Sequence, residues 1–169
     1  MSYKAKRFVA RTSLVALSVA FDMVSKHSAE LKRELAVWED GRLFSLGVLP
    51  NGPAFLLKKE GDRIRYVGEG QNDAEIKILF KNIDSALLLT TCRMGSHTAF
   101  AQHRSIVHGD ITRAVQISRA MNIVQPYLVP GFVLKRISKQ APKLTTAQVL
   151  FKARFLATLP VAMLLSTRR

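Results

Sequence analysis

The first 27 residues have the hydrophobic pattern of one long amphipathic helix. Its polar side chains recur at spacings of three, four or seven residues: Lys4, Arg7, Arg11, Ser18, Asp22 and Ser25. This period predicts a helix with a wide apolar face. Because charged residues interrupt the apolar run, we do not expect it to span a membrane. The apolar face either packs on the rest of the chain or lies in a membrane interface.

The period of the apolar positions changes to two in the middle of the chain, which predicts β-strands. A short helix over 28–39 comes first, and the alternating runs are then 42–49, 53–59, 62–68 and 74–80. Asn51-Gly52 lies between the first two runs and is a strong hairpin signal. We expect consecutive strands to pair as a meander, with one face covered and the other in water.

Helices return after the fourth run. Asn82 or Asp84 can cap a helix that carries residues 86–89, and a second short helix covers 96–102. One further strand follows at 104–109.

A longer amphipathic helix begins after that strand. Asp110 stands where an N-cap is expected, and Pro126 should end or kink the helix. Thr112, Arg113, Gln116 and Arg119 are predicted to face water. The predicted apolar stripe consists of Ile111, Ala114, Val115, Met121 and Val124.

Three segments in this order, AEIKILF, KNIDSALLL and TAFAQHRSIVHGDITRAV, resemble the sterol carrier protein type 2 domain. In that family an edge strand ends in Gly-Asp at the cap of the next helix, as Gly109-Asp110 does here. The resemblance covers 28–130 and is greatest for small bacterial members, some similar to accessory proteins of ubiquinone biosynthesis. It implies an α+β fold with a mostly antiparallel sheet of about five strands, covered by helices. The N-terminal helix (1–27) and a basic, apolar helical extension (131–169) would flank this domain.

The resemblance also implies a lipid-binding tunnel between the sheet and its helices, with no chemistry and no cofactor. The alternative is that the two faces meet tightly and leave a solid core. Carried onto this chain, the tunnel wall would be Phe44, Leu46, Ile76, Ile78, Phe80, Leu88, Phe100, Ser105, Val107, Ala114, Ile117 and Met121.

Ser105 departs from the family pattern, which usually has an aliphatic residue there. Either the cavity has a polar spot near Ser105, or the strand slips by one residue and Ile106 faces inward. The slip would turn Arg104 and His108 inward, which is costly without partners. We therefore expect Ser105 and Val107 to face in, which favours a ligand with one polar feature.

The basic residues are concentrated in the second half of the chain. The net formal charge is +14, and no carboxylate side chain follows Asp110. Such asymmetry indicates an anionic partner, either nucleic acid or a membrane surface. The C-terminal helix has an uncharged run, 155–165, that is too short to span a bilayer. The residues we expect at a membrane surface are Lys4, Arg7, Arg11, Lys135, Arg136, Lys139, Lys152 and Arg154.

Other chemistry finds little support in the sequence. His97, His103 and His108 lack the spacing of zinc ligands and the accompanying Cys or carboxylate ligands. We expect Cys92 to be a small buried side chain and not a nucleophile. We expect no metal, no cofactor and no enzymatic activity. A nucleic-acid interface is disfavoured because the aromatics do not alternate with cations on a sheet face.

The predicted function is to bind and carry, or present, an apolar lipid at an anionic membrane surface. The lipid could be a sterol, a fatty acyl chain, a phospholipid or a polyprenyl quinone. We expect a cytoplasmic protein with peripheral membrane contact. The alternative is a scaffold or accessory subunit of a lipid or ubiquinone biosynthesis complex, with the terminal helices binding partner enzymes.

Overall fold

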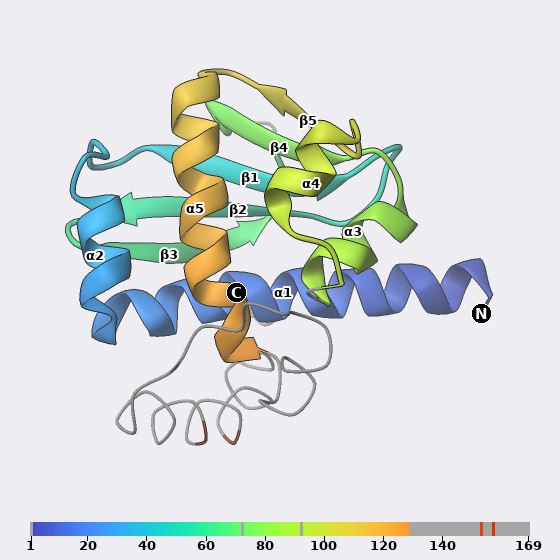
Figure 1. Ribbon diagram of the computed structural model, residues 1–169, viewed down its shortest axis with the longest axis horizontal. Helices are drawn as coiled ribbons and strands as arrows, with labels where there is room; N and C mark the ends of the chain where they lie inside the picture. Colours follow the sequence, from blue (N-terminus) through green and yellow to red (C-terminus); the bar gives the residue numbers. More distant parts are fainter. Residues whose placement is uncertain (1, 72, 92, 129–152, 154–156, 158–169) are drawn as a thin grey trace.

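The computed structural model of the chain describes residues 2–71, 73–91 and 93–128, together with 153 and 157. Figure 1 shows a sheet with helices in front of it. The helices are α1 (Tyr3–His27), α2 (Ala29–Leu35), α3 (Ile83–Thr90), α4 (Ser96–Ala101) and α5 (Ile111–Leu128). The strands are β1 (Leu43–Val48), β2 (Ala54–Glu60), β3 (Arg63–Glu69), β4 (Ile76–Phe80) and β5 (Ser105–His108).

The five strands form one mixed sheet in the order β3-β2-β1-β4-β5. Three neighbouring pairs are antiparallel, and β1 and β4 are parallel. The predicted α+β class and the mostly antiparallel five-stranded sheet are confirmed. The predicted meander is wrong at its fourth strand, because β4 lies beside β1 and not beside β3.

The connection from β3 to β4 reaches the back of the sheet at Gln71. It starts where the Gly70 amide donates to the Ala54 carbonyl and ends where the Glu75 amide donates to the Leu43 carbonyl. Between these points it passes Gly47, where an added Cβ would lie 3.2 Å from Gln71 Oε1. A glycine at this strand position therefore makes room for the crossing chain.

The back face is consequently not an open, wet face, as the alternation in the sequence had suggested. Ser45 is fully buried there, and Leu79 on β4 is only 5% exposed. Arg63 and Arg65 do face water on the edge strand β3, as predicted, while Ile64 is buried on the other side. The expectation of one wet face is therefore right at the edge and wrong in the middle.

The helices cover the front face. Figure 1 shows α1 running along the β3 edge, α5 crossing in front of the strands, α2 on one side and α3 and α4 on the other. Leu14, Leu17 and Phe21 of α1 are fully buried in the same core as the sheet. By length and composition α1 could cross a membrane, but 56% of its most apolar stretch is buried inside the molecule.

Two helix starts follow the predicted capping chemistry. Of the two candidates for the cap of α3, Asn82 is the cap, because its Oδ1 accepts from the Ser85 amide at 2.8 Å, whereas Asp84 lies inside the first turn. Asp110 Oδ1 accepts from the Thr112 amide at 2.7 Å and so caps α5. Gly109 has a φ of +98°, and a Cβ there would clash with the Glu75 carbonyl oxygen, so this turn requires glycine.

Candidate functional site

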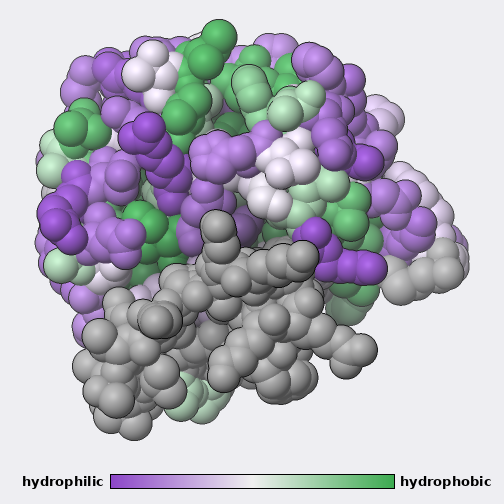
Figure 2. Space-filling view, in the orientation of Figure 1, coloured by the Kyte–Doolittle hydropathy of each residue, from purple (hydrophilic) through white to green (hydrophobic). Residues whose placement is uncertain are grey.

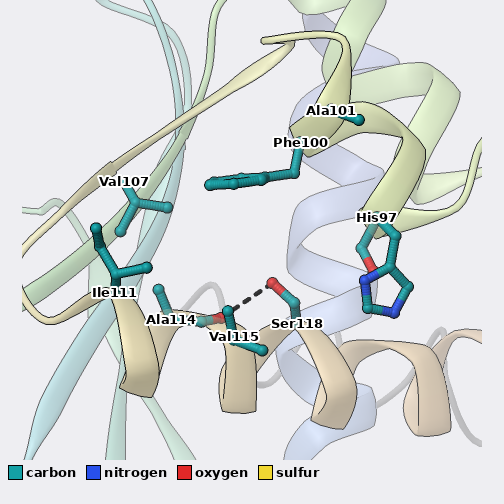
Figure 3. Close-up of a pocket in the computed structure, with 9 residues that line it drawn as sticks. His97, Phe100, Ala101, Val107, Ile111, Ala114, Val115 and Ser118 are labelled. Carbon is teal, nitrogen blue, oxygen red and sulfur yellow. Dashed lines mark hydrogen bonds between the residues drawn. The ribbon is translucent and has the colours of Figure 1, made fainter.

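An apolar cavity of about 130 Å³ lies between α4, β5 and α5. In Figure 3 the Phe100 ring of α4 lies across it, facing α5. The lining residues are Ser96, His97, Phe100, Ala101, Val107, Ile111, Ala114, Val115 and Ser118.

Three short or small features leave this space unfilled. β5 has only four residues and none of them is fully buried, so the sheet offers little apolar surface at this edge. Val107 is the β5 residue in the wall. Opposite it, Ala114 of α5 is only 2% exposed yet has too small a side chain to reach across. Ala101 is the corresponding small residue on α4.

The hydroxyl groups in the wall already donate within the protein. Ser118 Oγ donates to the Ala114 carbonyl at 3.0 Å, which is the dashed line in Figure 3. Ser96 Oγ donates to Asn122 Oδ1 at 2.9 Å. His97 is exposed and lies at the end of the cavity near Ser118, away from Val107 and Ile111. The wall therefore suits an apolar group, with an exposed imidazole at one end.

The predicted register of β5 is confirmed. Val107 pairs with Ile78, and Ser105 pairs with Phe80, so both β5 residues are on the covered face with their partners. Val107 lines the cavity, whereas Ser105 is half-buried and is not in its wall. The polar spot expected inside the cavity is therefore not supplied by Ser105 in this arrangement.

In the structure, some residues of the predicted tunnel wall line the cavity, most pack in the main core, and Leu88 and Ser105 do neither. Phe100, Val107 and Ala114 are brought together around the cavity. Leu88 is half-buried on α3 and does not line it. The rest pack in the main hydrophobic core: Phe44, Leu46, Ile76, Ile78, Phe80, Ile117 and Met121. Which of these residues contact a bound lipid stays a prediction.

Sequence reasoning missed six residues of this wall, although helical spacing carried a signal for most of them. His97, Phe100 and Ala101 recur at spacings of three and four on α4. On α5 the corresponding set is Ile111, Ala114, Val115 and Ser118. Ile111 and Val115 were predicted to be buried in the apolar stripe, but they are 64% and 39% exposed. Both residues line the cavity and do not pack in the main core.

An ion-pair cluster holds the start of α5 to the sheet. Glu39, after α2, accepts from Arg113 Nη2 at 2.9 Å and from Arg42. Arg42 also pairs with Glu75 at the start of β4. The hydrogen bond from Arg113, with those from Arg42, lowers the pKa of Glu39, and the hydrogen bond to Glu39 raises the pKa of Arg42. These ion pairs thus tie the start of α5 to the segment after α2 and to the chain just before β4.

A second hollow, of about 530 Å³, lies on the surface where α1 meets β2 and β3, and it is lined by charged residues. Its carboxylates are paired: Asp22 with Lys26, Glu60 with Arg65, and Asp62 with Lys32. The hydrogen bond from Lys32 lowers the pKa of Asp62. These exposed pairs balance one another, so this hollow indicates a solvated surface and not a binding site.

The structure describes only three of the predicted membrane-surface residues, Lys4, Arg7 and Arg11. Lys4 is exposed on α1. Arg7 donates to the Asn51 carbonyl at 3.2 Å, and Arg11 is ion-paired with Glu69. The remaining ones lie outside the described residues: Lys135, Arg136, Lys139, Lys152 and Arg154.

No group of three or more His, Cys, Asp or Glu residues that could hold a metal ion occurs in the part of the chain that the structure describes. His97, His103 and His108 are all exposed there. Cys92 lies outside the described residues.

Comparison with known proteins gives matches in structure alone. No protein-family model and no curated protein sequence matches this chain. A crystal structure of sterol carrier protein 2 aligns with a TM-score of 0.51 and 14% identity, over 65% of this chain and 93% of that one. A conserved hypothetical protein of Thermus thermophilus, described as a candidate sterol carrier protein, aligns with a TM-score of 0.50 and 16% identity. That alignment covers 65% of this chain and 81% of the other.

A third structure, UbiJ-SCP2, named a ubiquinone synthesis protein, aligns over 78% of this chain and 99% of its own. Its TM-score of 0.47, at 16% identity, is too low to carry an argument about function. The two alignments at 0.50 and above show a shared fold with this chain. This chain therefore has the fold of the sterol carrier protein 2 domain.

Proposed function

We propose that this protein binds an apolar lipid in the cavity between α4, β5 and α5, and carries or presents it at an anionic membrane surface without catalysing a reaction. The observation that carries the proposal is the apolar cavity itself, with Phe100, Val107 and Ala114 in its wall. A space with apolar walls and no free hydroxyl donors disfavours water and favours hydrocarbon.

The size of the cavity limits what it takes in this form. At about 130 Å³ it compares with the engineered apolar cavity of roughly 150 Å³ that binds benzene. Pockets for drug-sized ligands usually measure about 300–1,000 Å³. The cavity therefore matches the end of one chain, and binding of a whole lipid requires it to widen.

The elements around the cavity are suited to widening. β5 is a short edge strand with half-exposed residues, and α4 has only six residues. Phe100 on α4 is half exposed and so has few contacts to lose. Segments with few buried apolar contacts open at the lowest free-energy cost. Movement of α4 away from α5 would lengthen the cavity along the covered face of β4.

The division into a lipid-binding domain with separate terminal helices is a proposal as well. α1 packs its buried face into the same core as the sheet. We therefore include it in the unit that would bind the lipid, and propose membrane contact only for its exposed residues.

The experiment is to purify the full chain from its own host under mild conditions and identify the retained lipid by native mass spectrometry and extraction. We expect a stoichiometric apolar lipid in the wild type and a strongly reduced amount in Ala114→Trp, which fills the cavity. Val67→Ser, on the opposite edge strand, is the control. Repeated recovery of a lipid-free protein, or an Ala114→Trp variant that retains lipid at the wild-type ratio, would contradict the proposal.

A further inference from the structure

The mouth of the cavity is formed by apolar side chains that point into solvent. Phe100, Ile111 and Val115 are 50%, 64% and 39% exposed, and all three also line the cavity. Figure 2 shows hydrophobic residues at the surface near the upper end of α5, with hydrophilic residues on either side. Exposed apolar side chains that gather at one place usually mark an interaction site.

The charge around this mouth is positive. Arg119 follows Ile111 and Val115 at a spacing of four, so the three share the exposed face of α5. Arg119 makes no ion pair within the described residues. The nearby carboxylate of Asp110 accepts from the first amides of α5 and pairs with Arg113.

We propose that this mouth, made of Phe100, Ile111, Val115 and Arg119, is the surface that docks on an anionic lipid bilayer. The apolar side chains enter the interface, and Arg119 pairs with anionic headgroups. This inference rests on the proposed function, because docking by the mouth lets an apolar chain pass between bilayer and cavity without crossing water.

The same geometry argues against a protein as the occupant of the mouth and against the end of α1 as the docking surface. A protein seated on the mouth would close the cavity, whereas a bilayer supplies and accepts the chain. The exposed end of α1, with Tyr3 and Phe8, is the other apolar surface near cations. However, Lys6 and Arg11 there are ion-paired with Asp84 and Glu69, and no residue of α1 lines the cavity.

Sedimentation of the full chain with vesicles tests the proposal, using phosphatidylcholine and phosphatidylglycerol in equal amounts. The double variant Ile111→Ser/Val115→Ser should bind these vesicles on the order of tenfold more weakly than wild type. Its melting temperature should stay close to that of wild type, because both side chains are already exposed. Arg119→Glu is the second variant; it should weaken binding to these vesicles and leave the weaker binding to pure phosphatidylcholine unchanged.

Val67→Ser is the matched control, since Val67 is 46% exposed on β3 at the far edge of the sheet. It should bind vesicles like wild type. The proposal is overturned if both mouth variants bind the vesicles as tightly as wild type, or if Val67→Ser loses as much vesicle binding as the mouth variants do. It is overturned as well if Phe8→Ser on α1 loses vesicle binding and the mouth variants do not. It is also overturned if the wild type does not bind vesicles, which would leave a protein partner as the occupant.

Retained lipid, measured on the same variants without vesicles, separates this inference from the proposed function. A wild type that carries no lipid but needs its mouth for vesicle binding supports the docking surface and refutes the carrier. A wild type that carries lipid but binds vesicles independently of the mouth refutes the docking surface alone.

Discussion

The front of the sheet is filled at the β3 side and left partly empty at the β5 side. Under α1, the side chains of Phe21, Leu57 and Ile64 are fully buried, and the Phe21 and Phe44 rings meet edge to face with centroids 6.1 Å apart. Under α4, the ring of Phe100 is half exposed and a cavity remains beside Val107. One sheet therefore supports both a solid core and an apolar cavity.

The difference follows from the elements that cover each end. A 25-residue helix lies along β3 and supplies large apolar side chains to it. A six-residue helix and a four-residue edge strand enclose the other end, where α5 contributes Ala114. We infer that stability comes mainly from the α1 side, so that the α4 side can remain open enough to bind. The predictions that follow test this division.

Removal of a large side chain from each end should give the largest contrast. Phe21→Ala should lower the free energy of unfolding by about 3–5 kcal/mol, because it leaves a cavity in a solid core. Phe100→Ala should cost about 1 kcal/mol or less, because its ring is half exposed. Urea denaturation followed by circular dichroism measures both. Equal losses would show that the α4 end carries as much of the stability as the α1 end.

Addition of a large side chain should also be tolerated better at the cavity than in the solid core. Ala120→Trp should destabilise by about 1–3 kcal/mol through overpacking, since Ala120 is 1% exposed in the core and does not line the cavity. Ala114→Trp, nearer the start of the same helix, should cost clearly less because the cavity accepts the ring. Chemical denaturation of the two variants side by side gives the comparison. If Ala114→Trp is the more damaging, the space beside Ala114 is not available to a ligand.

Loss of the α5 cap should loosen the cavity end without unfolding the molecule. Asp110→Ala should cost about 1 kcal/mol and speed hydrogen exchange in the first turn of α5. Asp84→Ala is the control, since Asp84 lies in the first turn of α3 but Asn82 provides the cap. Exchange measured by mass spectrometry should therefore change at the cavity mouth only in the first variant. A global increase in exchange would contradict this local role.

The smallest expected effect concerns pH. Arg113 and Arg42 hold the pKa of Glu39 below its ordinary value of 4.5, so the folded state binds the Glu39 proton more weakly than the unfolded state. The stabilisation is complete above the unfolded pKa and is lost as pH falls through the folded pKa. As pH falls below that ordinary pKa, the melting temperature of Glu39→Gln should therefore decrease less steeply than that of wild type. Near neutral pH it should lower the melting temperature slightly, because Glu39 is an exposed ion-pair partner. If the melting temperature of Glu39→Gln falls with pH as steeply as that of wild type, the ion pairs of Glu39 do not stabilise the attachment of α5.

Several features were predictable from the sequence because they depend on neighbours along the chain. Asp110 as an N-cap needs only the amides that follow it, and the inward positions of Ile64 and Tyr66 need only the alternation of a strand. The register of β5 followed from the cost of turning Arg104 and His108 inward. The ordered set of segments also indicated the sterol carrier protein 2 fold.

The cavity was predictable only in part. Phe100, Val107 and Ala114 appeared in the expected wall because the fold brings α4, β5 and α5 together. The expected wall also included Ile76 and Met121, which pack in the core. Whether a position faces a cavity or a neighbouring side chain depends on volumes contributed by distant segments, which no local pattern encodes.

By itself the sequence determined the order of helices and strands, their caps, and the strong positive charge after Asp110. Tertiary structure alone decided that β4 lies beside β1, and that Ile111 and Val115 stay exposed at the cavity mouth. The physical reason is range: propensity and capping act over a few residues, whereas strand order and exposure depend on which distant segment covers each face.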